Sequence, residues 1–454
     1  MTLAKALAAI VGAENALDDS GSLAAYATDH KERGVPPLVA VLPATTAEVQ
    51  AIVRLCAAQG VALIPRGAGT GTVGGAVPEA AAVVLDLSRM NRILAVDADN
   101  LLADVEAGVV TGDFQRAMEK QGLFYPPDPS SSDTSTLGGN AATNAGGLRA
   151  IKYGVTGDWI AGLQIVLADG QLIRAGTRTR KGVVGYDLTR LFVGSEGTLG
   201  VIVGLTLRLA PKPATKRTLL AVFADVRQAG EAVLAVLRGP VTPAAMELMD
   251  ASALAAVRSK LPAPIPPGHA TLLLDVDGDA ESTAREAAAL AEILAGTKMV
   301  ALRRSASEEE AKALWAARRA ISQALYEIRP QRAADDVAVP ISALVELFEG
   351  VEQIAKKAGV QHACFGHAGD GNVHVNLLYD PADDDESARV KRAREEVFRL
   401  TLRLGGTLSG EHGVGVAKRA FVPWEQPAAL IDLQKRLKRA FDPLDILNPG
   451  KVFP

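Results

Sequence analysis

The sequence is poor in cysteine, has no excess of basic residues and contains no long apolar run. Its two cysteines, Cys56 and Cys364, form no metal-binding pattern and no disulfide framework, which predicts core residues in a reducing compartment. A formal net charge of −4 argues against nucleic acid as a partner. No apolar run approaches the roughly 20 residues of a membrane span, and the apolar N-terminus, interrupted by Glu14, indicates an amphipathic helix rather than a signal peptide. We therefore expect a cytoplasmic globular enzyme, whose 454 residues are enough for two or three domains.

Histidine is also scarce, yet two of the six, His367 and His374, lie on either side of the dipeptide Asp370-Gly371. Asp-Gly between apolar runs is a strong hairpin signal. With these as the two loop residues, His367 faces His374 at a Cβ separation of roughly 4.5–5.5 Å, and Asn376 points to the same face. Two imidazoles so placed can share a cation. The alternative, that both histidines pack within a strand pair, stays open.

A second group of polar residues follows in a glycine-rich segment, where Glu411 and His412 are adjacent. In such a segment the backbone can aim side chains that packing does not bury. Two histidines and one glutamate with an open position make a catalytic type of metal site. The predicted ligands of a divalent metal, Zn or Mn, are therefore His367, His374 and Glu411, which leaves His412 free to act as a base.

Glycines recur as G-x-G-x-x-G at Gly69, Gly71 and Gly74, the spacing of a dinucleotide-binding loop. That motif must open a helix. Here Pro78 follows closely and residues 83–87 are predicted to form another strand, so we reject NAD binding. The loop can still present backbone N–H groups to a diphosphate, although an ordinary glycine-rich turn is the alternative.

Two further stretches favour ligand binding, and a change in composition favours a second domain. Residues 125–147 form a long segment rich in hydroxyls, amides and glycines, and long loops in compact domains are usually functional. Residues 185–202 are also rich in glycine and polar residues. From about residue 214 glycine thins, and alternating strands and helices predict a mixed sheet with helices on one face.

These motifs together resemble the flavin-linked D-2-hydroxyacid dehydrogenase branch of the vanillyl-alcohol oxidase superfamily. The resemblance covers nearly the whole chain, and six stretches occur in the order found in the family: Pro65–Gly75, Pro126–Gly147, Gly185–Ile202, Gly366–Asn376, Ser409–Gly415 and Asn448–Lys451. It implies an α+β fold with a bipartite FAD-binding domain of two α+β subdomains over 1–210. A substrate (cap) domain with a mixed or antiparallel sheet would cover 211–408 and carry the metal hairpin. Residues 409–454 would close the active site and dock on the FAD domain.

The resemblance also implies how FAD is held. Family members that link FAD covalently carry a His in the diphosphate loop, and this loop has none, so non-covalent FAD is expected. The implied contacts are Arg66, Gly67, Ala68, Gly69, Thr70, Gly71 and Thr72 for the diphosphate, Ser131, Thr134, Gly138, Gly139 and Asn144 for the flavin, Glu196 and Ile202 on the adenosine side, and Asn448.

The same resemblance assigns the substrate site to Arg318, Ser322, Asn376 and His412, and it supports the predicted metal ligands. By composition alone, Arg318 would be placed on a solvated helix face. The implied reaction converts a D-2-hydroxy acid to a 2-oxo acid. The metal would hold the hydroxyl and carboxylate, His412 would take the proton, and hydride would pass to the flavin N5. Arg318 would orient the carboxylate.

One departure from the family bears on the substrate. Enzymes acting on 2-hydroxyglutarate carry a Lys where this chain has Ala334. Arg332 could substitute for that Lys, so a dicarboxylate is disfavoured rather than excluded, and a D-lactate-like substrate is predicted. The alternatives are D-2-hydroxyglutarate dehydrogenase, a glycolate oxidase flavin subunit acting in a complex, and a metal hydrolase. The electron acceptor stays open among a quinone, a cytochrome and an electron-transfer flavoprotein, as do a homodimer and peripheral association with the inner face of the membrane.

Overall fold

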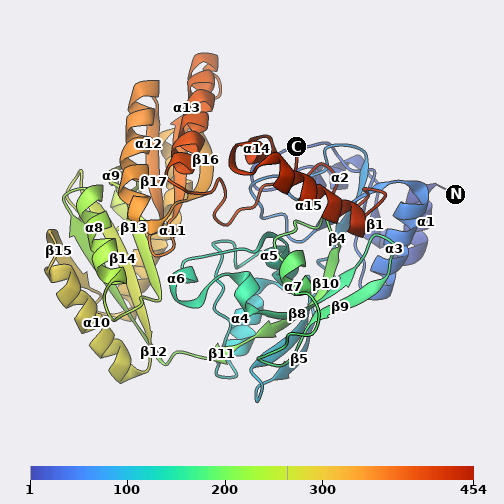
Figure 1. Ribbon diagram of the computed structural model, residues 1–454, viewed down its shortest axis with the longest axis horizontal. Helices are drawn as coiled ribbons and strands as arrows, with labels where there is room; N and C mark the ends of the chain where they lie inside the picture. The colour runs from blue at the N-terminus through green and yellow to red at the C-terminus, as the bar shows by residue number, and fades with distance from the viewer. Residues whose placement is uncertain (1, 263) are drawn as a thin grey trace. The chain divides into compact units, whose positions relative to one another are not determined.

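The computed structural model describes residues 2–262 and 264–454, which form two compact units (Figure 1). Unit 1 comprises Met1–Gly146, Val155–Lys212 and Glu411–Pro454, and unit 2 comprises Gly147–Gly154 and Pro213–Gly410. The two later divisions fall two residues beyond the domain limits expected from the sequence. The short Gly147–Gly154 insertion was not foreseen.

Unit 1 begins with a four-stranded sheet in the order β1-β2-β4-β3. Its strands are β1 (Ala16–Leu17), β2 (Val39–Val41), β3 (Ala62–Arg66) and β4 (Ala82–Asp86), and its helices are α1 (Leu3–Val11), α2 (Ser20–Tyr26) and α3 (Thr46–Gln59). Caps mark both ends of α3. The Thr45 side chain accepts the Glu48 N–H at 3.2 Å, and Gly60 ends the helix in the left-handed conformation.

A five-stranded antiparallel sheet completes unit 1, in the order β5-β6-β10-β8-β9. These strands are β5 (Ile93–Asp97), β6 (Leu102–Glu106), β8 (Ile160–Val166), β9 (Leu172–Gly176) and β10 (Val201–Arg208), and β7 (Leu123–Phe124) pairs with β11 (Ala210–Pro211). Three helices accompany them: α4 (Thr111–Glu119), α5 (Leu137–Thr143) and α7 (Leu188–Phe192). One apolar core joins both sheets, since Val83 and Leu85 of β4 belong to the same buried cluster as Val105 of β6 and Leu207 of β10.

The C-terminal segment, with helices α14 (Val422–Glu425) and α15 (Ala428–Phe441), belongs to unit 1. After α15 the chain forms a parallel bridge with β3. The Leu63 N–H donates to the Ile446 carbonyl at 2.7 Å, and the Asn448 N–H donates to the Leu63 carbonyl at 2.8 Å. Residues near the C-terminus therefore extend the first sheet of the chain.

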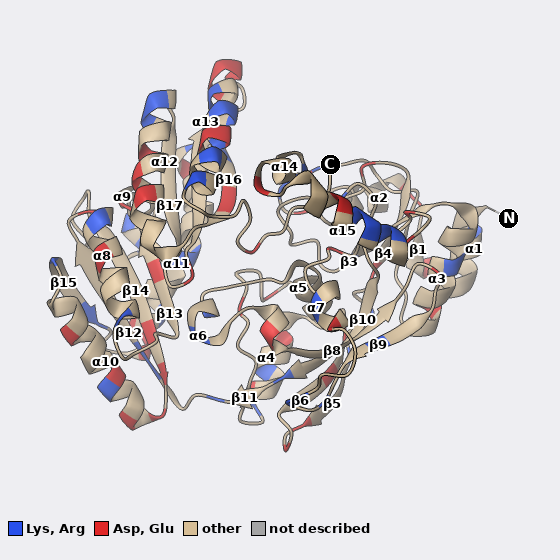
Figure 2. Ribbon diagram, in the orientation of Figure 1, with Lys and Arg blue, Asp and Glu red and all other residues tan. Residues whose placement is uncertain are grey.

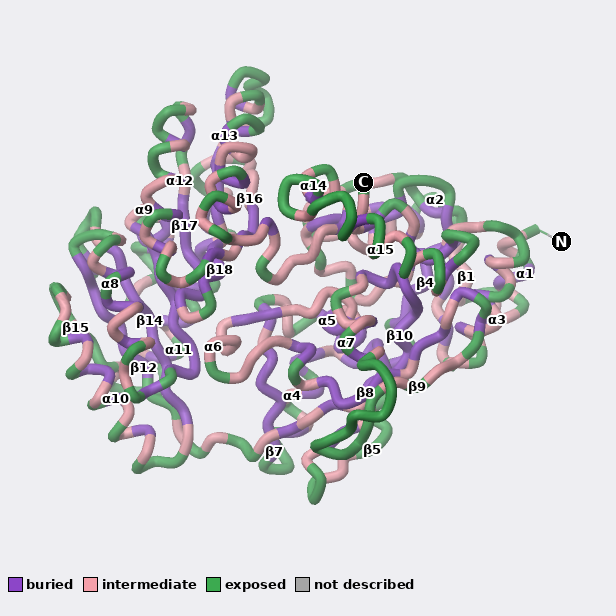
Figure 3. Tube along the Cα trace, viewed as in Figure 1, coloured by how far each residue is buried: buried purple, intermediate pink, exposed green. Residues whose placement is uncertain are grey.

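Unit 2 is built on a seven-stranded antiparallel sheet in the order β15-β12-β14-β13-β17-β18-β16. Its strands are β12 (Thr215–Phe223), β13 (Ala245–Met249), β14 (Ala270–Gly278), β15 (Met299–Arg304), β16 (Gln331–Ala338), β17 (Gln361–His367) and β18 (Asn372–Tyr379). Its helices are α6 (Ala150–Tyr153), α8 (Val226–Leu237), α9 (Ala251–Ala256), α10 (Ala280–Ala295), α11 (Glu308–Ile328), α12 (Leu344–Ala358) and α13 (Asp384–Arg403). Figure 3 shows the central strands buried along most of their length.

Helices cover both faces of this sheet, so the prediction of helices on one face is wrong. Successive residues of a strand point to opposite faces. Leu378 packs with Trp315 of α11, whereas its neighbour Leu377 packs with Ala355 of α12 and Val390 of α13. Figure 2 shows both signs of charge interspersed along α12 and α13, as expected for helices with one solvated side.

The inserted segment Gly147–Gly154 is tied to unit 2 by polar contacts to β14. The Lys152 ammonium lies 2.6 Å from the Asp277 carboxylate, and the Tyr153 hydroxyl donates to the same group at 2.9 Å. This segment therefore belongs to unit 2 although both of its flanks in the chain belong to unit 1. Among the described residues, no helix is long and apolar enough to cross a membrane.

The hairpin with the two histidines exists, but its predicted register is wrong by two residues. His367 lies opposite Asn372, and Phe365 lies opposite His374. The connection therefore spans residues 368–371 instead of the two residues predicted.

A second pairing of β17 explains the wider loop. The Ala368 N–H donates to the Met246 carbonyl of β13 at 2.8 Å, so Ala368 pairs with β13 and not within the hairpin. His367 and His374 still share a face as diagonal neighbours, and their ring centroids are 5.2 Å apart. The expectation that both imidazoles lie together on one face is thus met by a different register.

Candidate active site

In the glycine loop after β3, several glycines either leave no room for a side chain or adopt a backbone conformation that disfavours one. No helix follows the loop before β4, as predicted. Gly69 and Gly74 have φ values of 68° and 76°, in the left-handed region that favours glycine. A Cβ atom at Gly67 would lie 2.3 Å from the Thr136 hydroxyl oxygen. The loop therefore exposes its peptide groups, as binding of a diphosphate requires.

Polar groups in and beside this loop are held away from water. Arg66 donates to the Ala76 carbonyl at 3.2 Å and lies 5.6 Å from the Tyr26 ring centroid. Burial lowers the pKa of Arg66, while the Asp86 and Asp29 carboxylates act in the opposite direction. The Thr72 hydroxyl is buried without a hydrogen-bond partner among the described residues. Such an orphaned group is accounted for if a ligand supplies its partner.

The predicted flavin-lining stretch contains helix α5, where the sequence suggested only a long loop. Thr136 caps this helix by accepting the Gly139 N–H at 3.2 Å. A Cβ atom at Gly138 would lie 2.6 Å from that of Ala107, so glycine allows α5 to pack closely against the chain after β6. Asn144 ends the helix at φ 53° and accepts the Gly157 N–H at 2.8 Å.

The other two predicted flavin residues, Ser131 and Thr134, lie in the turn before α5. The Thr134 hydroxyl donates to the Ser131 carbonyl at 3.2 Å. The turn and the helix thus form one ordered stretch of unit 1.

Glu196 and Asn448 join three of the predicted FAD stretches inside unit 1. The buried Glu196 carboxylate accepts the N–H groups of Val414 at 2.7 Å and Gly415 at 2.9 Å. Burial raises the pKa of Glu196, and these two hydrogen bonds oppose the shift. The Asn448 amide donates to the Glu196 carbonyl at 2.6 Å and to the Gly75 carbonyl at 2.8 Å, while its own oxygen is buried without a partner among the described residues.

Of the remaining predicted FAD positions, Ile202 is buried in β10, and Ala68, Thr70 and Gly71 lie within the glycine loop. The glycine loop, the α5 stretch and the C-terminal segment all belong to unit 1.

In unit 2, one face of the sheet carries three of the seven predicted substrate and metal residues, His367, His374 and Asn376. The register of four neighbouring strands puts alternate residues of each strand on this face. They are Arg332, Ala334 and Asp336 of β16, His374 and Asn376 of β18, Phe365 and His367 of β17, and Glu247 of β13.

Arg318 does not lie on a solvated helix face. It is buried, and its Nε donates to Glu247 Oε2 at 2.6 Å. Its guanidinium also lies 4.5 Å from the Phe365 ring centroid. Glu247 accepts a further contact from His367 Nδ1 through its other oxygen. Burial alone would raise the pKa of Glu247, but Arg318 and His367 together hold it below its ordinary value.

Ser322 follows one turn after Arg318 on α11 and is half-buried. Arg318, predicted to contact a substrate carboxylate, thus already has a carboxylate partner within the protein. That predicted role of Arg318 stays a prediction.

Asn376 is fully buried and uses its amide within the sheet. Its Nδ2 donates to the Ala363 carbonyl at 3.1 Å and to the His374 carbonyl at 3.2 Å. Its Oδ1 accepts a hydrogen bond from Arg332 Nη1. Asn376 therefore holds the Arg332 guanidinium on this face.

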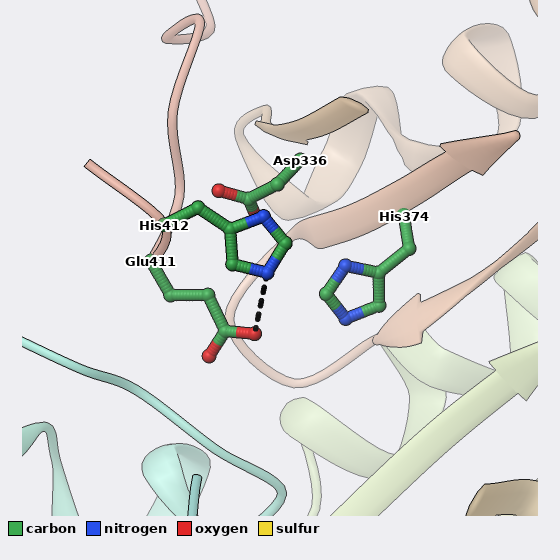
Figure 4. Close-up of side chains that lie close together, drawn as sticks. All are labelled: Asp336, His374, Glu411 and His412. Atoms are coloured by element: carbon green, nitrogen blue, oxygen red, sulfur yellow. Dashed lines mark ion pairs between the residues drawn. The ribbon is translucent and has the colours of Figure 1, made fainter. Parts of the chain in front are cut away.

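Asp336, which was not predicted, fixes the start of the C-terminal segment. It is buried opposite His374 and accepts hydrogen bonds from the Gly410 N–H at 3.0 Å and the Ser409 hydroxyl at 3.3 Å. Glu411 and His412 are the next two residues. Figure 4 draws these side chains, and its dashed line marks the ion pair in which His412 Nε2 lies 3.8 Å from Glu411 Oε1.

Two functional candidates were thus missed, and only one left a signal in the sequence. Asp336 lies two residues after Ala334, the position at which enzymes acting on 2-hydroxyglutarate carry a lysine. Glu247 lies in an apolar strand, 120 residues before His367, and nothing local distinguishes it.

Comparison with known proteins adds two family matches. The description "FAD linked oxidases, C-terminal domain" matches residues 212–452, more than half of the chain, and "FAD binding domain" matches residues 37–176.

Several characterised proteins are similar over almost the whole chain. Glycolate oxidase subunit GlcD of Bacillus subtilis is 41% identical over 447 residues, 98% of this chain and 95% of that protein. D-2-hydroxyglutarate dehydrogenase of Stutzerimonas stutzeri is 35% identical, covering 96% of both chains. D-lactate dehydrogenase of Anaerostipes hadrus is 33% identical, covering 92% of this chain and 89% of that protein.

Solved structures share the fold at lower identity. p-Cresol methylhydroxylase with substrate bound aligns with a TM-score of 0.82 at 20% identity, over 99% of this chain and 96% of its own. Alkyldihydroxyacetonephosphate synthase aligns with a TM-score of 0.79 at 20% identity, over 98% and 85%. These two likenesses show a common architecture.

Proposed function

Since the chain belongs to the FAD-linked oxidases and is an FAD-linked oxidoreductase, we propose that it oxidises a D-2-hydroxy acid to the corresponding 2-oxo acid. The family matches confirm the resemblance on which the expected FAD-binding fold rested. Three relatives are named for glycolate, D-2-hydroxyglutarate and D-lactate, which are all 2-hydroxy acids. The observation that carries the proposal is the sheet face of unit 2, which carries His367, His374 and Arg332 on neighbouring strands.

The residues of unit 1 fit FAD. The glycine loop presents bare peptide groups, and the orphaned Thr72 hydroxyl and Asn448 oxygen are buried polar atoms that a ligand would satisfy. No histidine or cysteine occurs between residues 65 and 75, so the cofactor would be held without a covalent bond. When bound, FAD supplies the acceptor for the hydride that leaves the substrate C2.

Metal binding is the second part of the proposal. The proposed ligands of a divalent cation such as Zn or Mn are the predicted His374 and Glu411 together with Asp336, because imidazole and carboxylate groups suit these metals. His412 keeps its proposed role as the base. The peptide chain supports this grouping, because Glu411 directly follows Gly410, whose N–H is bonded to Asp336.

His367 remains a proposed ligand as well. A contact between one ring nitrogen and a carboxylate, as between His367 and Glu247, is typical of metal-ligating histidines. A bound cation would lower the pKa of the substrate hydroxyl.

In this proposal each side chain has a defined task. His412 accepts the proton of the C2 hydroxyl as general base. Glu247 holds Arg318 and His367 in fixed orientations through its two oxygens. Asp336 anchors the segment that carries His412. The site therefore combines a positioned base with rigid supports, which is how geometry lowers a reaction barrier.

The side chain of the substrate is proposed to be short, as in D-lactate. Ala334 lies opposite Asn376 on the site face, at the position where relatives acting on 2-hydroxyglutarate place a lysine. A buried carboxylate without a cationic partner costs several kcal/mol. An apolar or small side chain meets no such cost.

The test is an anaerobic stopped-flow screen of 2-hydroxy acids for bleaching of the bound flavin. Short D-2-hydroxy acids should reduce the flavin, and their L-enantiomers should be poor, because the base and the carboxylate partner fix the substituents at C2. A flavin that no 2-hydroxy acid reduces would contradict the proposal.

A second candidate is a subunit that works only within a complex, since one relative is named as a glycolate oxidase subunit. Reduction of an artificial dye by the purified chain and substrate would show that the chain is active alone. A requirement for added partner proteins would favour the complex.

A further inference from the structure

We propose that Arg332 holds the carboxylate of the substrate, an inference that rests on the proposed oxidation of a 2-hydroxy acid and deepens it. The substrate is an anion, so its site needs a cation whose charge is not already balanced. Two arginines lie at the site face of unit 2, Arg318 and Arg332. They differ in whether a carboxylate of the protein already balances the charge of the guanidinium.

Arg318 is already balanced by a carboxylate. Its Nε and Nη2 both lie against Glu247 Oε2, at 2.6 and 2.5 Å, and both residues are buried. Breaking a buried ion pair by drawing away one partner leaves an uncompensated charge, which is strongly unfavourable. A substrate carboxylate would have to compete with Glu247 for this guanidinium.

Arg332 has only uncharged partners. Its Nη1 donates to the amide oxygen of Asn376, and its guanidinium lies 5.0 Å from the Tyr326 ring centroid. In the part of the chain that the structure describes, Arg332 forms no salt bridge, and its Nε is buried without an acceptor. A guanidinium held by an amide and an aromatic ring keeps its full charge for an incoming anion.

The hydrogen bonds of Asn376 explain why the arginine, and not the amide, would meet the substrate. Both amide hydrogens of Asn376 already go to the carbonyls of Ala363 and His374. Asn376 is therefore a positioning residue in this chain. It orients Arg332 on the face that also carries His374, the proposed metal ligand.

The count of charges then limits the substrate. Apart from the proposed metal, which would act on the C2 hydroxyl, one arginine without a carboxylate partner matches one substrate carboxylate, and Ala334 beside it adds no second cationic side chain. The site assigned here takes monocarboxylic 2-hydroxy acids, with Arg332 as the specificity-determining cation.

The experiment compares three substitutions in the FAD-containing enzyme: Arg332→Ala, Arg332→Lys and Arg319→Ala. Arg319 is an exposed arginine next to Arg318 on the same helix, so its removal controls for loss of one positive charge. Pyruvate serves as the probe, and its Kd is measured from the change that it causes in the absorbance of the oxidised flavin. Flavin content and melting temperature establish that each variant is folded.

Arg332→Ala should weaken pyruvate binding by roughly ten- to a hundredfold, the range of one charge-assisted hydrogen bond. Arg332→Lys should recover part of the loss, and Arg319→Ala should change Kd by less than about twofold. In turnover, KM for D-lactate should rise more than kcat falls, because the contact exists in the ground state as well as in the transition state.

Unchanged pyruvate binding in a folded Arg332→Ala variant would overturn the inference. A loss of binding in a fourth variant, Arg318→Lys, would then assign the carboxylate to Arg318. Because the binding measurement needs no turnover, it is independent of the flavin-bleaching screen. If that screen fails while Arg332→Ala still loses pyruvate binding, the proposed reaction is wrong and the carboxylate site stands.

Discussion

In unit 1 the candidate cofactor contacts are mostly backbone groups on contiguous stretches, whereas in unit 2 the candidate substrate and metal groups are side chains on helix α11 and several strands. The glycine loop needs only small residues at Gly67, Gly69 and Gly74. The pairing of Arg318, Glu247 and His367 needs three elements to meet at one point. Backbone sites of this kind are specified locally, and side-chain sites are specified by the tertiary fold.

Each unit contains a buried glutamate, and the pKa values of the two glutamates shift in opposite directions. Glu196 of unit 1 faces peptide N–H groups, and burial raises its pKa. Glu247 of unit 2 faces Arg318 and His367, which lower its pKa. For Glu196, the peptide N–H groups and the charges of Lys451 and Lys418 only partly offset the loss of water, whereas Arg318 and His367, which contact Glu247 directly, exceed it. Direct contact with cationic partners therefore decides in which direction the pKa of a buried glutamate shifts.

Removal of the metal should have the largest effect on turnover, and it should not affect the binding of FAD in unit 1. Prolonged chelation should abolish turnover while FAD stays bound, because the proposed ligands lie outside the glycine loop. Zinc or manganese should restore activity to the wild type but not to His374→Ala. Elemental analysis accompanies the assay, and full activity in a metal-free preparation would refute the metal proposal.

Replacing the base should have the next largest effect. His412→Gln should lower kcat by roughly 10²- to 10⁴-fold, since it removes general base catalysis. Flavin content should not change. Stopped-flow flavin reduction measures the step directly, and a rate within a few-fold of wild type would assign the proton transfer to another group.

The two buried glutamates should respond to pH in opposite directions. Glu247→Gln should destabilise the protein by about 3–5 kcal/mol at neutral pH, because it leaves the charge of Arg318 unpaired. The stabilisation from Glu247 is present above the ordinary glutamate pKa of 4.5 and is lost as the pH falls through its lower folded value.

For Glu196 the contribution to stability depends on pH in the opposite direction. Its folded pKa is raised, so its contribution to stability is present below its ordinary pKa of 4.5 and is lost as the pH rises through the folded value. Glu196→Gln should therefore cost less near pH 7 than near pH 4. Urea unfolding of both variants and the wild type across this range measures the two slopes, and parallel slopes would contradict the contrast.

Substrate preference should respond more modestly to Ala334. The unmodified enzyme should prefer D-lactate over D-2-hydroxyglutarate in kcat/KM by roughly 1.5–3 kcal/mol, one missing charge-assisted hydrogen bond. Ala334→Lys should shift the preference toward the dicarboxylate. Steady-state kinetics with both acids provide the measurement. Preference of the wild type for D-2-hydroxyglutarate would mean that another cation serves the second carboxylate.

The smallest expected effect lies in the glycine loop and comes with a matched control. Gly67→Ala places a Cβ atom 2.3 Å from the Thr136 hydroxyl, so it should destabilise unit 1 by about 1–3 kcal/mol and weaken FAD retention. Gly71→Ala meets its nearest atom, a carboxylate oxygen of Asp29, at 3.6 Å and should be tolerated. Melting temperature and flavin content are measured for both variants. Equal values would mean that the loop shifts enough to accommodate a Cβ atom at residue 67.

Much of unit 1 was predictable because its signals are local. The caps of α3 at Thr45 and Gly60 and the absence of a helix after Gly74 could be inferred from neighbouring residues alone. The hairpin register was not predictable, because the pairing of Ala368 with Met246 joins residues more than 100 positions apart. Glu247 escaped notice for the same reason. Helix α5 was missed because glycines at its start suggested a loop, whereas Gly138 is needed for close packing against Ala107.

The pairing of the C-terminal segment with β3 determines when, during synthesis of the chain, the contacts around the glycine loop can form. The glycine loop is synthesised early, yet the Gly75 carbonyl can bind the Asn448 amide only after 373 further residues have been made. The pairing of Leu63 with Ile446 must wait equally long. The chain passes between the units at residues 146/147, 154/155, 212/213 and 410/411, so neither unit is one continuous stretch of chain. A nascent chain therefore cannot complete the contacts between the glycine loop and Asn448 before residue 448 has left the ribosome.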